Sequence, residues 1–405
     1  MINKKSRGFL IVYVIFLVSM LLLGSVSMGP MTIRNIMTVI MFFYCFTEGY
    51  YKLDRYFALY LCFIFFFIVS SAVSGDFGNG LKKTLSYYFV CYVAYQATKC
   101  VILKYGEGDI IVKTLLYIGI IDAIVTIGQF FGNPLAYAMF EAIKPKGISG
   151  DMLEYFSTFG TLSGVVIPGL VGGVANGYLL SGVCALAFYD KNSEIKLRNI
   201  ALVLFLLAAL FMVQERSGIV AGVLIVAMLF VKYLRYRFNL YVLLLFVLAL
   251  FYISPVVVDF LSDEQSKFVN LDHSIEQRLG FVGQTFDFLR ENPWGSIYEY
   301  GRIHEFPPHN VFLNSFIYAG VLGAPFIIVL IIIQFVQIIP IFFKKLTTNS
   351  QQILLFGCVY ITYTLNSMFH NASLVTGDPM FWISWAFVAC HVQQERRNTL
   401  NQIQR

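Results

Sequence analysis

The chain has 405 residues, of which 58% are hydrophobic and only 13% are charged, and its formal net charge is +6. Its mean hydropathy of +0.72 exceeds that of soluble globular domains, in which apolar and charged residues are more evenly balanced. This composition excludes an ordinary soluble enzyme. It also excludes a nucleic-acid partner, because such binding needs a continuous basic face on a soluble domain.

Apolar segments recur along the whole chain. About twelve of them approach the roughly 20 residues that a membrane-spanning helix requires. They lack the period-2 alternation of a membrane β-barrel, as residues 198–210 (RNIALVLFLLAAL) illustrate. We therefore predict an all-α integral membrane protein with about twelve transmembrane helices. The predicted spans are 8–28, 35–50, 56–73, 84–103, 110–132, 161–189, 199–214, 217–233, 239–256, 311–343, 352–370 and 379–394.

The loops between these spans predict how the chain is oriented. The first span follows a basic start but is too long for a signal peptide and lacks a small-x-small cleavage site, so we interpret it as an uncleaved helix. Lys and Arg gather on the side that holds both termini, which predicts cytoplasmic termini. We therefore expect helices 1–9 within residues 1–256, a large periplasmic loop at 257–309, and helices 10–12 with a cytoplasmic tail at 310–405.

Cofactor signals are weak. All seven cysteines lie within or beside apolar spans and form no CxxC pair, so neither a disulfide framework nor a zinc site is indicated. His304, Glu305 and His309 lack HExxH-type spacing, and we expect no metal or other cofactor. Asp122 is an intramembrane carboxylate, which normally marks a function or a buried partner.

The large loop contains a predicted helix from Ser274 to Arg290. Ser274 is a suitable N-cap, and the residues at 292–295 (NPWG) end the helix because proline cannot continue it. The segment 311–343 is too long for one upright span, so we expect it to tilt or to begin at the interface. The loop helix carries one apolar stripe at three- and four-residue spacing, which predicts that it lies along the membrane surface. The stripe consists of Ile275, Leu279, Val282, Phe286 and Leu289.

Two arginines could bind phosphate. Arg216 lies in the tight hairpin QERSG, where it either faces a lipid-linked phosphate or, with Glu215, simply snorkels to the interface. Arg278 lies in the loop helix, where it could bind phosphate, contact lipid headgroups or pair with a nearby carboxylate. Arg290 and Arg302 are further candidates for the phosphate role.

His309 is the best candidate for a proton acceptor. It follows two prolines and opens the helix HNVFLN, and an imidazole titrates near neutral pH. The alternative is a polar cap, and Asn310 could equally be the helix N-cap. His304 could share the site or lie on the loop rim. Three aromatic residues of the loop could bind substrate or anchor the interface. They are Trp294, Tyr298 and Tyr300.

Three motifs, in this order, resemble the bacterial O-antigen polymerase and O-antigen ligase superfamily. They are QERSG, QRLGFVGQTFDFLRENPWGS and PPHNVFLNSFIYAGVLGAP, and together they span residues 214–325. The resemblance implies a metal-independent glycosyltransferase of the bacterial inner membrane, with a GT-C-type helical bundle and a periplasmic active site. Arg216 and Arg278 would neutralise a pyrophosphate leaving group, and His309 would activate or orient the acceptor hydroxyl.

The resemblance also implies the substrates. The donor would be a glycan on undecaprenyl pyrophosphate, and membrane lipids and a chain-length regulator protein are further candidate partners. The PPHN start and the step from Tyr318 to Gly320 favour a polymerase, which joins lipid-linked repeat units. The alternative is a ligase, which transfers the finished glycan to lipid A-core. A transporter for the same lipid-linked sugars is a third alternative, but it would need more charged residues inside the spans.

Overall fold

A computed structural model of the chain is helical throughout its described parts, apart from one short strand pair. It describes residues 4–24, 26–28, 31–143, 162, 164–165, 173–190, 195–236, 271–304, 307–308, 310–344, 348–370 and 374–403. Strands β1 (Ser27–Met28) and β2 (Met31–Thr32) pair antiparallel. The α-helices are α1 (Lys4–Leu21), α2 (Ile33–Thr47), α3 (Arg55–Val73), α4 (Phe77–Lys83), α5 (Phe89–Cys100), α6 (Gly108–Phe130), α7 (Pro134–Ile143), α9 (Gly173–Leu186), α10 (Leu197–Val213), α11 (Arg216–Tyr236), α13 (Leu271–Glu291), α14 (Ile297–Ile303), α15 (Val311–Ile338), α16 (Thr348–Ser367) and α17 (Pro379–Ile403).

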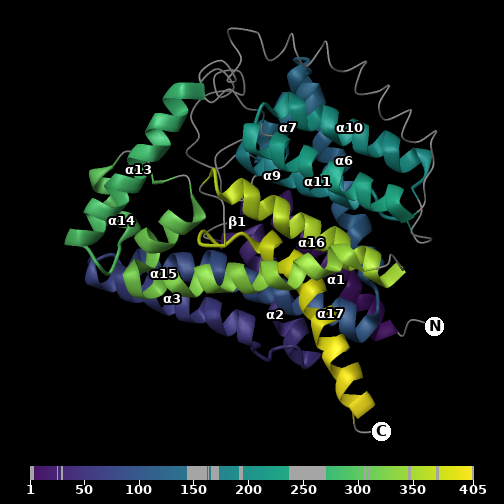
Figure 1. Cartoon of the computed structure of the whole chain (residues 1–405), viewed down its shortest axis with the longest axis horizontal. Helices are drawn as coiled ribbons and strands as arrows, with labels where there is room; N and C mark the ends of the chain where they lie inside the picture. Colours follow the sequence, from purple (N-terminus) through teal and green to yellow (C-terminus); the bar gives the residue numbers. More distant parts are fainter. Residues whose placement is uncertain are drawn as a thin grey trace.

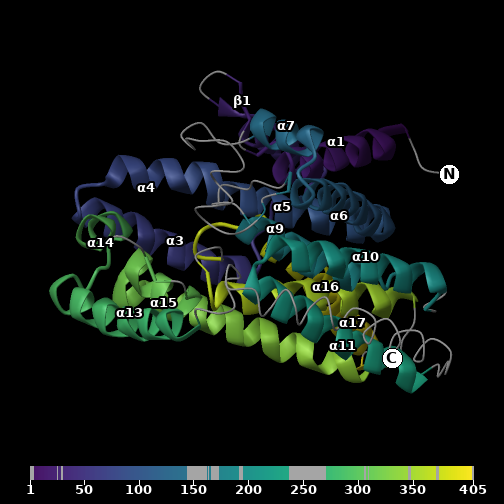
Figure 2. The same ribbon diagram turned by 90° about the horizontal axis from the view of Figure 1, so that it is seen from above.

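The long helices form a bundle with α9 near its centre. Helix α9 packs against α6, α10, α11 and α16, while α15 lies along α3 and α17 packs between α5 and α16. Helix α1 begins and α17 ends at the same end of the bundle, and α13 and α14 lie at the opposite end (Figures 1 and 2). The loop helix and the termini are therefore separated by the length of the bundle.

Every predicted span that contains described residues includes a helix, and 239–256 lies outside the described residues. Within 8–28 the helix ends at Leu21, and within 161–189 the described helix is Gly173–Leu186. Four helical segments are long and apolar enough to cross a membrane: Arg55–Val73, Gly108–Phe130, Arg216–Tyr233 and Val311–Phe343. Shorter apolar helices accompany them. The all-α class is thus confirmed, whereas twelve spans and a GT-C-type bundle stay predictions.

Aromatic side chains fill the interior of the bundle. Trp382 is fully buried, and its ring lies 4.7 Å from Phe57, 5.0 Å from Tyr60 and 5.1 Å from Tyr95, measured between centroids. Large apolar side chains also cover the outer surface. Such an extended apolar exterior is unusual in soluble proteins and is expected of a surface that faces lipid. Examples are Phe43, Phe65, Val231, Ile332 and Val336.

Three predicted boundaries need correction. The span at 84–103 belongs to a longer helical stretch that starts with α4 and contains two π-helical turns, η1 (Thr84–Tyr88) and η2 (Val101–Tyr105). The loop helix starts at Leu271, so Ser274 lies inside it and is not its N-cap. The 311–343 segment ends in a 3₁₀ turn, η3 (Ile339–Phe343), and contains a backbone break at Gly320, where φ is 65° and ψ is −172°.

Candidate active site

The hairpin between α10 and α11 is built around a buried carboxylate. Gln214 ends α10 in the left-handed conformation, with φ of 61°. Glu215 is buried and accepts hydrogen bonds from the Ser217 hydroxyl at 2.9 Å and the Gly218 amide at 2.5 Å. The snorkelling alternative is therefore wrong for Glu215. Arg216 begins α11 and is partly buried, with its Nε atom inside the protein.

His370 is the partner of Glu215. Its Nε2 atom lies 2.5 Å from Glu215 Oε1, and both side chains are largely shielded from solvent. Burial opposes ionisation of this carboxyl, but the imidazole and the hydrogen bonds from Gly218 and Ser217 outweigh it, so the pKa of Glu215 is lowered. The site therefore contains an ionised carboxylate that holds the first turn of α11 against the segment after α16.

Hydrogen bonds around this pair join the ends of α11, α15 and α16 and the middle of α9. Ser217 donates to Asn366 Oδ1 at 2.8 Å, and the Asn366 amide donates to Ser181 of α9 at 3.0 Å. Asn310 caps α15, as predicted, by accepting from the amides of residues 312 and 313. Its own amide donates to the Met368 carbonyl at 3.3 Å. The starts of α11 and α15 are thus fixed to the same end of α16.

The NPWG turn is seated in the break of α15. The Val321 amide donates to the Pro293 carbonyl at 3.0 Å. A β-carbon at Gly320 would overlap the backbone of Pro293 and Trp294, and one at Gly295 would meet the backbone of α15. Both glycines have positive φ. The two glycines are required at this contact because only glycine combines that conformation with such a close backbone approach.

The loop helix α13 packs through a face that differs from the predicted stripe. Phe281, Thr285 and Phe288 are buried, whereas Val282 and Phe286, which belong to the stripe, are exposed. Leu289 is the stripe residue that is buried among the described side chains. The interior of this junction is completed by Phe316 and Ile317 of α15. The three- and four-residue spacing of apolar residues identified a helix but did not show which face of it contacts protein.

Two of the three predicted catalytic side chains lie outside the described residues. Arg278 lies on α13, but its side chain is outside the described residues, and His309 is also outside them. Of the two further phosphate candidates, Arg290 is 80% exposed and pairs with Asp287 at 3.0 Å. Arg302 pairs with Asp76 at 3.0 Å and therefore links α14 to the start of α4.

The remaining predicted substrate-binding residues lie on or beside α14. Tyr300 is fully buried, with its ring 5.2 Å from that of Phe288 and 4.4 Å from that of His304. A sugar could reach the Tyr300 ring only if α13 moved. Tyr298 is partly buried, and burial together with the nearby Tyr318 and Asp76 raises the pKa of Tyr298 to about 12.

Asp122 has a structural partner. It is fully buried and accepts a hydrogen bond from the Val165 amide at 2.8 Å. Gln129 holds the same segment by exchanging two hydrogen bonds with the backbone of Gly164, at 2.9 and 3.1 Å. The amide of Leu162 donates to the carbonyl of Val213, just before the Glu215 hairpin. Asp122 therefore helps to place this segment beside the site.

Sequence reasoning missed His370 and Asp378 as members of this region. They flank the polar stretch HNASLVTGD between two apolar spans, and that stretch was the available signal. Asp378 accepts from the Met380 amide at 2.9 Å and so caps α17. Burial raises the pKa of Asp378 to about 6, although the Met380 amide and the Arg34 cation oppose this. Arg34 is itself buried and donates to the Ser86 carbonyl at 3.2 Å.

Asp378→Asn is expected to flatten the dependence of stability on pH. The carboxyl ordinarily titrates near 3.8 but keeps its proton in the folded protein up to about pH 6. Folding stability should therefore fall as the pH rises between these values. Asparagine caps helices as well as aspartate does, so the variant should lose this fall but keep the cap. Thermal unfolding of the purified protein at pH 4.5 to 7.5 measures this, and equal slopes for both proteins would contradict it.

One comparison with known proteins covers this region. Residues 201–330 match the family model described as O-antigen ligase. No curated protein shows a significant match to the chain. The matched region runs from α10 to α15 and contains all three motifs. Together with the apolar helices, this match fits a multi-pass membrane protein. Residues 201–330 are thus similar to the family described as O-antigen ligase, in agreement with the resemblance of the three motifs to the O-antigen polymerase and ligase superfamily.

Proposed function

We propose that the protein is an O-antigen polymerase that joins oligosaccharide repeat units carried on undecaprenyl pyrophosphate. The acceptor hydroxyl attacks the anomeric carbon of the donor glycan, the bond from that carbon to the phosphate oxygen breaks, and undecaprenyl pyrophosphate leaves. His309 takes the hydroxyl proton. The observation that carries this proposal is the hydrogen-bonded junction of α11, α15 and α16, which brings Arg216 and the start of the His309 helix to one end of the bundle.

The electrostatics of the junction suit a pyrophosphate leaving group. Arg216 lies at the first turn of α11, where the helix dipole also favours an anion. The oxygens of the neighbouring Glu215 are engaged by His370, Ser217 and Gly218. Positive charge that is fixed in advance stabilises a departing anion without reorganisation. Arg278 would add a second guanidinium from α13.

The position of the junction relative to the chain termini supports a periplasmic reaction. The α11–α15–α16 junction and α13 lie away from the end where α1 begins and α17 ends (Figure 1). Since the Lys and Arg bias predicts cytoplasmic termini, the reaction takes place at the periplasmic face. Exposed Val282 and Phe286 on α13 would rest on the membrane surface, where the lipid carrier of the donor is anchored.

A ligase that transfers the glycan to lipid A-core is the second candidate. The description of the matched family favours it, while the PPHN start and the Tyr318–Gly320 step favour the polymerase. A transporter is less well supported. It would use charged residues along an intramembrane path, but Asp122, one such residue, is bonded to the backbone of Val165.

The two enzymes predict different products in cells that lack the activity. We expect Arg216→Ala, Arg278→Ala and His309→Ala each to abolish long glycan chains while the protein still accumulates in the membrane. Loss of a polymerase leaves a single repeat unit on the lipopolysaccharide core. Loss of a ligase leaves bare core and an accumulation of lipid-linked chains. Gel analysis of lipopolysaccharide and of extracted lipid-linked glycan separates these patterns, and full-length chains from all three variants would contradict both.

A further inference from the structure

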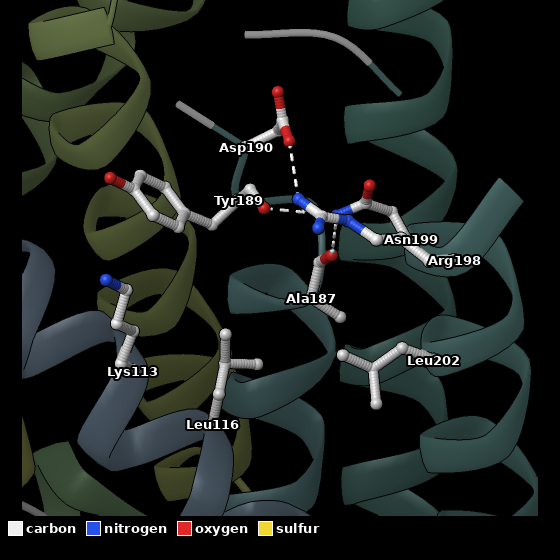
Figure 3. Close-up of a pocket in the computed structure, with 8 residues that line it drawn as sticks. All are labelled: Lys113, Leu116, Ala187, Tyr189, Asp190, Arg198, Asn199 and Leu202. Atoms are coloured by element: carbon white, nitrogen blue, oxygen red, sulfur yellow. Dashed lines mark hydrogen bonds and ion pairs between the residues drawn. The ribbon is translucent and has the colours of Figure 1, made fainter. Parts of the chain in front are cut away.

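A cavity of about 410 Å³ lies at the end of the bundle opposite to the candidate active site. It is formed by the second turn of α6, the end of α9 and the start of α10 (Figure 3). Its size is typical of small-molecule sites. Leu116, Ala187 and Leu202 are its apolar lining residues, and the polar and charged ones are Lys113, Tyr189, Asp190, Arg198 and Asn199.

The walls of this cavity are held rigidly. The Asn199 amide donates to the carbonyls of Ala187 at 2.8 Å and Tyr189 at 3.1 Å, so α10 is fixed to the end of α9. Tyr189 itself is nearly buried and donates to Asp109. These bonds use the amide nitrogen of Asn199 and the hydroxyl proton of Tyr189. The cations of the lining are therefore the groups left to select a ligand.

The lining carries a surplus of positive charge. Asp190 is nearly inaccessible and is shared by Lys196 at 2.8 Å and Arg198 at 2.6 Å, which leaves one positive charge beyond neutrality. Lys113 adds another cation, and within the described part of the chain it has no hydrogen-bond or ion-pair partner. The Asp109 carboxylate, which accepts from the Tyr189 hydroxyl, offsets one of these charges, so the net surplus around the cavity is one positive charge. Arg198 also lies in the first turn of α10, where the helix dipole favours an anion. The cavity is thus suited to a phosphate group.

Its position specifies the kind of phosphate. Lys113 lies near the start of the apolar α6, which is long enough to span a membrane. The two leucines belong to α6 and to the apolar α10, so they would continue from the cavity into the lipid layer. Basic pockets between membrane helices bind the headgroups of anionic lipids. We infer that this cavity binds the headgroup phosphate of an anionic phospholipid, with Lys113 and Arg198 on the phosphate and Leu116 and Leu202 against the first acyl carbons.

The purified full chain in a neutral detergent provides the test. Binding of dioctanoyl phosphatidylglycerol is measured by native mass spectrometry and compared with dioctanoyl phosphatidylcholine and with glycerol 3-phosphate. We expect the anionic lipid to bind most tightly. Lys113→Met should weaken its binding about fivefold, as expected for removal of one basic residue near a lipid surface. This substitution breaks no hydrogen bond or ion pair with another described residue. Arg198→Gln should have a similar effect, since Lys196 still pairs with Asp190.

Arg7→Gln is the matched control. Arg7 is an exposed cation in α1 at the same end of the bundle and does not line the cavity. Its removal should leave lipid binding unchanged. An equal loss from Arg7→Gln would show non-specific attraction and overturn the proposal. Glycerol 3-phosphate bound as tightly as the lipid would indicate a site for soluble phosphates instead. Unchanged lipid binding by both Lys113→Met and Arg198→Gln would also refute it.

Discussion

Arg216→Ala is expected to reduce glycan polymerisation by about 100- to 1,000-fold, the range typical for loss of one preorganised group that stabilises developing charge. The guanidinium is partly buried at the first turn of α11, beside a carboxylate that is already engaged by His370. Its replacement removes positive charge from the place where the pyrophosphate would leave. The rate of chain extension in membranes supplied with lipid-linked repeat units measures the effect.

Arg290→Ala provides the matched control for this loss. Arg290 is a cation in the same family region, but it is 80% exposed and pairs with an equally exposed Asp287. We expect its removal to change the rate less than twofold, because its side chain faces solvent and is paired with an exposed carboxylate. Arg216→Lys should retain part of the activity through its charge alone, since lysine lacks bidentate geometry. Equal rates for Arg216→Ala and Arg290→Ala would remove Arg216 from the proposed mechanism.

Gly320→Ala is expected to have the second large effect, on both stability and activity. A side chain at this positive φ costs on the order of 1–3 kcal/mol through the backbone alone. The added β-carbon would also overlap the backbone of Pro293 and Trp294, so the turn after α13 must move out of the break in α15. This displacement would separate α13, and Arg278 with it, from the α11–α15 junction. We expect both the melting temperature and the rate of chain extension to fall.

Gly283→Ala is the control for this substitution. Gly283 lies inside α13, and a β-carbon built there meets nothing within 4 Å. Alanine favours a helix over glycine by up to about 1 kcal/mol, so this variant should be as stable as the parent or more so. Wild-type activity of Gly320→Ala, with an unchanged melting temperature, would show that the contact between the turn and α15 is not needed.

Local features of the sequence predicted local structure well. Hydropathy located the helices of the bundle, Asn-Pro ended α13 at Glu291, and Asn310 was correctly identified as a possible cap. Each of these depends on a few neighbouring residues. The start of α13 was wrong because cap preference is a weak signal when the residues before Ser274 also tolerate a helix.

Contacts between distant residues could not be predicted in this way. Glu215 and His370 are 155 positions apart, and nothing in either local pattern indicates the other. From the sequence, Gly295 is an ordinary turn residue and Gly320 an ordinary helix-packing residue. Their close backbone contact is evident only from the way the turn after α13 packs on α15. The face of α13 that contacts protein depended on α15 in the same way, and the hydrophobic period did not indicate that face.

The sequence by itself determined that this is an apolar helical protein with a polar loop, and its motifs determined the superfamily that it resembles. The tertiary structure alone decided that Glu215 is buried against His370, that Asp122 supports a backbone segment, and that Arg290 faces solvent. The physical reason is that hydropathy and helix caps act over a few residues. The environment of a charged group is set by whichever helices pack around it, and these come from distant parts of the chain.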